Sequence, residues 1–267
     1  MDLYDAPADV VRKSIIGRGL TPEALATMAG LPTRELMGFL NGDFDARLAR
    51  MLAPLLEIDS AALCHLPDYQ PESPDLGRIR QFEAPFEDEE VNIWFIEADG
   101  TTLVIDCGFR PKDFEAQIEA LGDQAIHVLI THAHRDHIGG LSAASQSMLT
   151  SIHSPSGVSN SIAVSAGELL ELGPFTVQAV DLSGHHPETL GYLIKGPGVE
   201  AFAVGDAVFA GSIGGCPDSS AFALARRTIE AAFSEIAPGM TLLPGHGPAT
   251  SLGSEIRSNP FLASWLR

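Results

Sequence analysis

Three histidines and one aspartate lie within six consecutive positions of this sequence, and this cluster constrains the chain more than any other feature. The apolar run HVLIT at 127–131 is continued by HAHRDHIGG. Such a run predicts a β-strand, and loops that follow strands often carry functional residues. Imidazole and carboxylate groups together suit zinc, iron or manganese. In a turning segment His132 and His134 can face one point while Asp136 and His137 face another, which indicates two adjacent metal ions.

Three further loops carry the same donor types, each after a predicted strand. They are His185 after the strand at 175–181, Asp206 after 199–204 and His246 after 240–243. With this ligand order and context, residues 78–267 resemble the metallo-β-lactamase superfamily. The resemblance implies an α/β (α+β) fold of αββα sandwich type, with the metal ions at the edge where these loops meet.

The resemblance also implies a role for each donor. His132, His134 and His185 would hold one metal ion, Asp136, His137 and His246 the other, and Asp206 would bridge them. Asp136 is also the candidate catalytic residue. Two divalent ions about 3.5–4 Å apart lower the pKa of a bridging water and stabilise both the attacking and the leaving group. We expect zinc, with iron or manganese as alternatives.

Residues beside these donors have several expected roles. Asp106 is expected either to orient a ligating imidazole or to be a simple turn residue. His186, next to His185, is expected near the site or at the surface. Tyr192 is expected to pack in the core, and Cys216 to be a buried, inert thiol.

Two segments narrow the resemblance to one branch. GDAVFAGSIG at 205–214 and LLPGHGPATSLGSEIRSNPFL at 242–262 are similar to type II glyoxalase (hydroxyacylglutathione hydrolase)-like enzymes. This similarity implies cleavage of a small thioester or ester by a metal-bridging hydroxide. After GSIG at 211–214 many relatives carry an arginine, whereas this chain continues with Gly215 and Cys216. The basic C-terminal helical extension of the full-length enzymes is not found after Phe261. Both departures weigh against glutathione as the thiol.

Two other functions are open. Persulfide dioxygenases share the scaffold and use one iron held by two histidines and one aspartate, so an oxygen-dependent enzyme of this kind is the first alternative. The second is a metal- or metabolite-sensing regulator that binds DNA through the N-terminal part of the chain.

Residues 1–65 predict a small all-α helical domain. Apolar residues recur there at helical spacing, and the turn around Gly30 and Pro32 gives a resemblance to the helix-turn-helix of lambda-repressor-like domains. The second helix of that motif offers Arg34 against Glu35, and residues 1–75 hold six Lys and Arg against twelve Asp and Glu. Since DNA binders need a basic face, we expect a packing or homodimerisation module and no nucleic-acid partner.

The proline-rich segment LPDYQPESPDLG at 66–77 predicts a linker, and 78–267 the hydrolase domain. The formal charge of −19 repels phosphate backbones, which leaves a small-molecule substrate as the expected partner. The N-terminus MDLYDAPADVV lacks the pattern of a secretory signal, and no run of about 18 apolar residues could span a membrane. With only three scattered cysteines, a cytoplasmic location is expected.

Overall fold

The structure, a computed structural model, describes residues 2–266. Short helices build the first part of this chain: α1 (Pro7–Gly17), α2 (Pro22–Ala29), α3 (Thr33–Leu40), α4 (Ala46–Leu56), α5 (Ser60–His65) and the 3-10 turn η1 (Leu66–Asp68). Thr21 caps α2 by accepting a hydrogen bond from the Ala24 amide at 3.2 Å, and Gly30 ends α2 at φ 64°. None of the described helices is long and apolar enough to cross a membrane.

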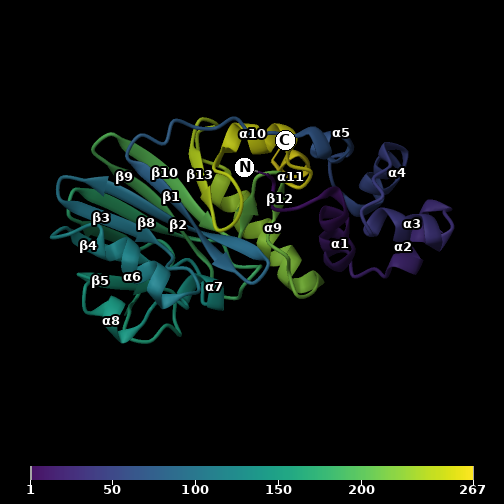
Figure 1. Ribbon diagram of the computed structural model, residues 1–267. Coiled ribbons are helices and arrows are strands. Elements are labelled where there is room, and N and C mark those ends of the chain that lie inside the picture. Colours follow the sequence, from purple (N-terminus) through teal and green to yellow (C-terminus); the bar gives the residue numbers. More distant parts are fainter. Residues whose placement is uncertain (1, 267) are drawn as a thin grey trace.

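Two mixed sheets form the middle layers of the rest of the molecule (Figure 1). The first has the order β1-β2-β3-β4-β5-β6, with β1 (Ile79–Phe86), β2 (Glu89–Ala98), β3 (Thr101–Ile105), β4 (Ala125–Leu129), β5 (Ser151–Ser154) and β6 (Ile162–Ala163). The second has the order β14-β13-β10-β9-β8-β7, with β7 (Leu169–Leu172), β8 (Phe175–Asp181), β9 (Leu190–Gly196), β10 (Val199–Gly205), β13 (Thr241–Pro244) and β14 (Thr250–Ser251). A small hairpin, β11 (Val208–Phe209) and β12 (Ser212–Ile213), follows β10.

The helices cover the outer faces of both sheets. They are α6 (Pro111–Glu119), α7 (Arg135–Ile138), α8 (Ala143–Gln146), α9 (Ser219–Phe233), α10 (Leu252–Ser258) and α11 (Leu262–Trp265). Phe114 of α6 packs with Phe95 on the first sheet, and Phe233 of α9 packs with Phe202 on the second. Between the sheets lies a third core that includes Trp94, Phe175 and Tyr192. This order of layers confirms the αββα sandwich preceded by a helical region.

The N-terminal helices share a core with the outer face of the second sheet. Val11 and Ile15 of α1 belong to the same buried cluster as Ile229 of α9. Gly17 lies so close to α9 that a Cβ there would stand 2.5 Å from the Phe222 ring. The helical region therefore packs directly on α9 and its neighbours (Figure 1).

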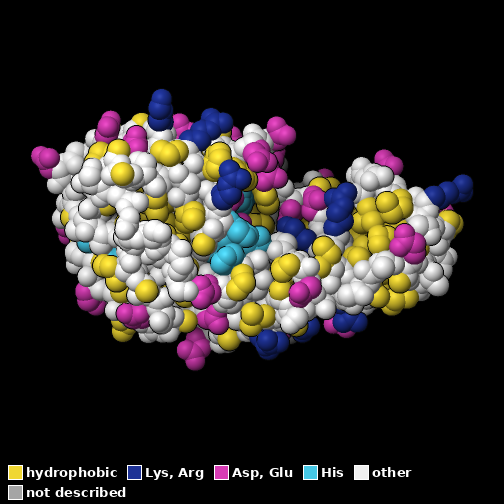
Figure 2. Space-filling model, turned by 90° about the horizontal axis from the view of Figure 1, so that it is seen from below, with side chains coloured by type: hydrophobic (Ala, Val, Ile, Leu, Met, Phe, Trp, Pro, Cys, Tyr) yellow, Lys and Arg dark blue, Asp and Glu magenta, His cyan; other side chains and the backbone are white. Residues whose placement is uncertain are grey.

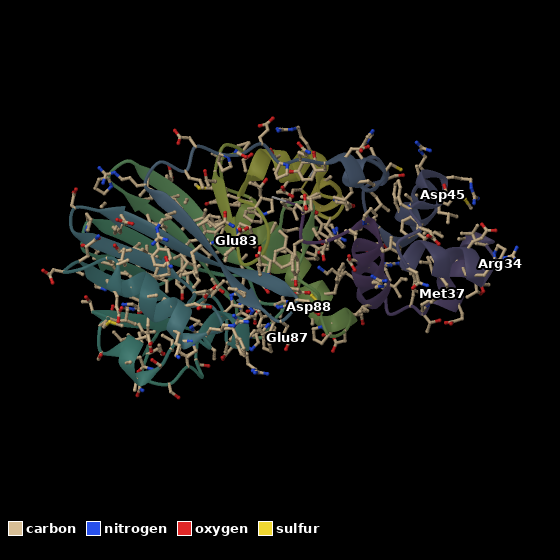
Figure 3. All side chains as sticks on the ribbon, in the orientation of Figure 1. Arg34, Met37, Asp45, Glu83, Glu87 and Asp88 are labelled. Atoms are coloured by element: carbon tan, nitrogen blue, oxygen red, sulfur yellow. The ribbon has the colours of Figure 1, made fainter. Side chains whose placement is uncertain are left out.

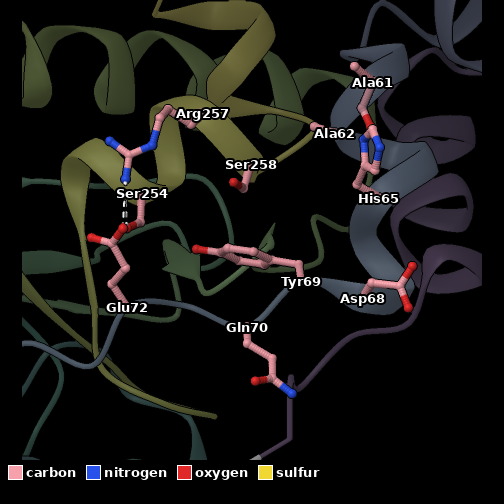
Figure 4. Close-up of a pocket in the computed structure, with 10 residues that line it drawn as sticks. All are labelled: Ala61, Ala62, His65, Asp68, Tyr69, Gln70, Glu72, Ser254, Arg257 and Ser258. Carbon is pink, nitrogen blue, oxygen red and sulfur yellow. Dashed lines mark hydrogen bonds and ion pairs between the residues drawn. The ribbon is translucent and has the colours of Figure 1, made fainter.

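The predicted linker is partly tied to the sandwich. Between η1 and β1, Tyr69 donates a hydrogen bond from its hydroxyl to Oε1 of the buried Glu255 at 2.7 Å. Glu72 lies 3.6 Å from Arg257 of α10. Tyr69, Glu72 and Arg257 border a cavity of about 470 Å³ between α5, the linker and α10 (Figure 4). No donor of the predicted metal site lines this cavity.

Candidate metal centre

All seven predicted donors meet at one edge of the sandwich. His132, His134, Asp136 and His137 follow β4, with the last two on α7, His185 follows β8, Asp206 directly follows β10 and His246 follows β13. Strands β3, β4 and β5 run parallel, as do β10 and β13, so their carboxyl ends bring these loops to the same edge.

The donor atoms form two groups, each within 4.8 Å. The first contains His132, His134, His185 and Asp206, and the second Asp136, His137 and His246. Asp206 reaches both groups: Oδ2 lies 3.5 Å from Nε2 of His185 and 3.5 Å from Nε2 of His246. Asp136 Oδ2 lies 3.3 Å from Nε2 of His246. The arrangement offers two adjacent coordination sites with one shared carboxylate.

Hydrogen bonds at the outer ring nitrogens aim the imidazoles at the centre. Nδ1 of His185 bonds to the Gly215 carbonyl at 2.6 Å, and Nδ1 of His246 bonds to the Glu90 carbonyl at 2.6 Å. In both residues Nε2 then faces Asp206. Such partners fix the tautomer and the orientation of a ligating histidine.

Asp106 provides the same support for His137. Its Oδ2 accepts hydrogen bonds from Nδ1 of His137 at 2.7 Å and from the Thr131 hydroxyl at 2.8 Å. Its Oδ1 accepts from the Thr131 amide at 2.8 Å. The carboxylate is buried at the end of β3, where the backbone has φ 59°. Of the two roles expected for Asp106, the orienting one agrees with these contacts.

Replacing Asp106 by asparagine is expected to weaken metal binding about 10- to 100-fold, because His137 loses the carboxylate that fixes its ring. Asparagine tolerates the left-handed backbone conformation, so the backbone should not be strained. Metal affinity measured by competition with a chelating dye checks this. Unchanged affinity would mean that Asp106 acts only as a turn residue.

The charges at the centre favour bound cations. Although burial opposes protonation, Asp206 and Asp106 raise the pKa of His137 well above its usual range. Asp206 and Asp136 likewise overcome burial and raise the pKa of His246 to about 10. Asp206, despite its burial, has a pKa well below its usual range because of His137 and His246. A bound divalent cation would balance the charge of these carboxylates while the histidines stay neutral.

Two buried atoms also fit a metal. Nε2 of His137 and Oδ1 of Asp206 have no hydrogen-bond partner among the described residues. The two atoms lie 3.3 Å apart. Buried polar atoms without partners are rare and call for an explanation such as an ion. The residues present therefore fit a pair of divalent metals.

The loop that carries His246 is held by the first sheet. The Asn92 side-chain amide donates to the Pro244 and Gly247 carbonyls at 2.9 and 2.8 Å, and the Trp94 indole donates to the Pro244 carbonyl at 2.8 Å. A Cβ at Gly245 would stand 2.1 Å from Oδ1 of Asp206, so only glycine allows this close approach.

Other singled-out residues lie near the centre without joining either group. The His186 ring lies 5.1 Å from that of His134, and its Nδ1 accepts from the Glu188 amide. Cys216 is buried, and burial raises the pKa of its thiol to about 11, in agreement with an inert role. Tyr192 lies between the sheets and donates to the Ile130 carbonyl at 2.7 Å.

The N-terminal segment before α1 also reaches the centre, which the sequence did not indicate. Tyr4 stacks on His246 with ring centroids 4.4 Å apart, and its hydroxyl donates to Glu89 at 2.6 Å. Lys13 of α1 donates to the Ile213 carbonyl at 2.8 Å. Figure 2 shows exposed histidines beside the indentation between the sandwich and the helical region. Contacts between residues this far apart in the chain cannot be predicted from a local sequence pattern.

Comparisons with known proteins agree with this fold and centre. A family model described as "Metallo-beta-lactamase superfamily" matches residues 87–146, which include the first four donors. Together with the sandwich, this match supports the metallo-β-lactamase superfamily as the class of this chain, and a metallohydrolase as its kind of enzyme.

Individual relatives are similar at modest identity. The probable metallo-hydrolase YqgX of Bacillus subtilis is 28% identical over 201 residues, which cover 65% of this chain and 92% of the relative. Hydroxyacylglutathione hydrolase GloC of Haemophilus influenzae is 27% identical over 197 residues, which cover 64% and 91%. The solved structure of TTHA1623 in a di-iron-bound form shares the fold at TM-score 0.53 and 24% identity, over 68% of this chain and 100% of that one.

Proposed function

We propose that the protein is a dinuclear metallohydrolase that cleaves a small thioester or ester. The observation that carries this proposal is the set of seven donors in two groups, with Asp206 within 4 Å of both. His132, His134 and His185 would hold one metal ion, Asp136, His137 and His246 the second, and Asp206 both. Zinc suits these donors, and iron or manganese are alternatives.

Divalent ions held by these residues would supply a water of lowered pKa and would polarise the substrate carbonyl. The chain's own residues hold the neutral imidazoles in place through Asp106 and the carbonyls of Gly215 and Glu90. We assign proton transfer to Asp136, whose side chain is more exposed than that of Asp206. The water oxygen bonds to the carbonyl carbon, the C–S or C–O bond breaks, and the proton passes through Asp136 to the leaving sulfur or oxygen.

The thioester assignment is supported by similarity to a hydroxyacylglutathione hydrolase and by the glyoxalase II-like segments at 205–214 and 242–262. We expect protein purified without added metal to contain two divalent ions per chain and to hydrolyse S-D-lactoylglutathione or S-acetyl-N-acetylcysteamine. Chelation should abolish turnover, and added metal should restore it. One iron per chain, oxygen consumption and no hydrolysis would instead favour the persulfide dioxygenase-like alternative.

For the helical region we propose a packing and homodimerisation role. Several exposed large apolar side chains support it, namely Ile16, Met28, Met37, Phe44 and Met51. Arg34, Met37 and Asp45 lie at the end of this region remote from the sandwich (Figure 3). A DNA-sensing role is disfavoured because α3 carries Arg34 beside Glu35. The molar mass in solution tests the dimer.

A further inference from the structure

A cavity of about 260 Å³ opens beside the metal centre, and much of its lining comes from the N-terminal part of the chain. His185 and Asp206 form the side toward the centre, and Phe209, Gly215 and Glu89 contribute to the rest. The remaining lining residues, which we call the N-terminal wall, are Tyr4, Asp5, Asp9 and Lys13. Asp206 is buried, and its Oδ1 has no hydrogen-bond partner among the described residues.

Specific contacts hold the N-terminal wall in place. The Tyr4 ring stacks on His246 at 4.4 Å and meets the Phe209 ring edge to face at 4.9 Å. Asp5 is buried in an ion pair with Lys13, which also donates to the Ile213 carbonyl at 2.8 Å. The wall is therefore tied both to the His246 loop and to the hairpin after Asp206.

One carboxylate of the cavity lacks a cationic partner. Asp5 pairs with Lys13, and Asp9 pairs with Arg12 at 2.7 Å. Glu89, by contrast, accepts the Tyr4 hydroxyl at 2.6 Å and has no ion-pair partner among residues 2–266. Asp206, the fourth carboxylate of the lining, faces four histidines, so Glu89 is the carboxylate of this cavity that has neither a cationic nor an imidazole partner among the described residues.

We propose that this cavity binds the thiol or alcohol part of the substrate, and that Glu89, oriented by Tyr4, is a specificity-determining residue that favours cationic or neutral groups there over anionic ones. The proposal rests on the hydrolase function above and deepens it. A glutathione moiety carries two carboxylates and one ammonium group, so this cavity disfavours it. Opposite charges at such a contact attract, and like charges repel.

The test uses three thioesters with one acyl group and different thiol charges: acetylthiocholine, S-acetyl-N-acetylcysteamine and S-acetylglutathione. For the metal-loaded protein we expect kcat/KM to decrease in that order. Glu89→Gln should lower the ratio of kcat/KM for acetylthiocholine to that for S-acetylglutathione about fivefold, the size expected for an exposed charge. The three thioesters differ in intrinsic reactivity, and this difference cancels when the ratio for each variant is divided by the ratio for the unaltered protein. Tyr4→Phe, which keeps the ring, should change the ratio in the same direction.

Glu87→Gln is the matched control. Glu87 lies in the turn between β1 and β2, two residues before Glu89, which begins β2 (Figure 3). It does not line the cavity. We expect it to leave the ratio unchanged. An equal effect of Glu87→Gln and Glu89→Gln, or a preference for S-acetylglutathione in the unaltered protein, would overturn the proposal.

A second readout does not depend on turnover. In calorimetric titrations of the metal-loaded protein, choline should bind more tightly than S-methylglutathione, and Glu89→Gln should weaken choline binding. The reverse order, or choline binding that is insensitive to Glu89→Gln, overturns the charge selection. If none of the three thioesters is hydrolysed but this binding pattern holds, the hydrolase proposal fails and the charge selection stands.

Discussion

Replacing Asp206 by asparagine is expected to lower kcat/KM at least about 1,000-fold, because a single side chain serves both groups of donors. Its Oδ2 lies within 4 Å of Nε2 in His132, His185 and His246. Asparagine keeps the shape but removes the negative charge that a shared ligand contributes. The metal content should fall below two ions per chain. Steady-state kinetics and elemental analysis of the same preparation check both expectations.

Asp99→Asn is the control for this experiment. Asp99 is an exposed residue in the turn between β2 and β3, at φ 47°, a conformation that asparagine also adopts. It should leave both metal content and kinetics unchanged. Two ions per chain and normal turnover in the Asp206→Asn protein would refute the shared-ligand assignment.

Replacing Phe222 by alanine is expected to lower the free energy of unfolding by about 3–5 kcal/mol, the usual cost of deleting a core phenylalanine. Phe222 is buried on α9, where its ring meets Gly17 of α1 and lies 5.6 Å from the ring of Trp265. Removal of the Phe222 ring would leave a cavity at the junction of the helical region and the sandwich. Denaturant unfolding followed by tryptophan fluorescence measures the change.

The same experiment tests whether the two regions unfold together, as we propose from their common core. Fluorescence and far-ultraviolet circular dichroism should then give one coincident transition. Phe44→Ala, at an exposed position in the helical region, should change the stability by less than about 1 kcal/mol. Two separate transitions in the unaltered protein would show that the helical region is an independent unit.

Strands with apolar faces were predictable, whereas an edge strand was not. The apolar runs at 127–131 and 175–181 were predicted as strands and correspond to β4 and β8. By contrast, β1 was missed because most of its residues are exposed or half-buried and it includes Pro85. As an edge strand it pairs only with β2, so burial imposes little pattern on its residues.

The sequence by itself determined which side chains could bind metal ions: the candidate donors, their order and their positions after strands are local properties, and the ligand type depends on the residue type. All seven donors meet at one edge, as the resemblance implied. The tertiary structure alone decided that Tyr4 covers His246 and that Glu89 lies in the cavity beside it. Those contacts arise because the apolar face of α1 packs against α9 and carries the preceding segment to the centre. Packing between distant segments depends on the shape of the whole core, which leaves no local pattern in the chain.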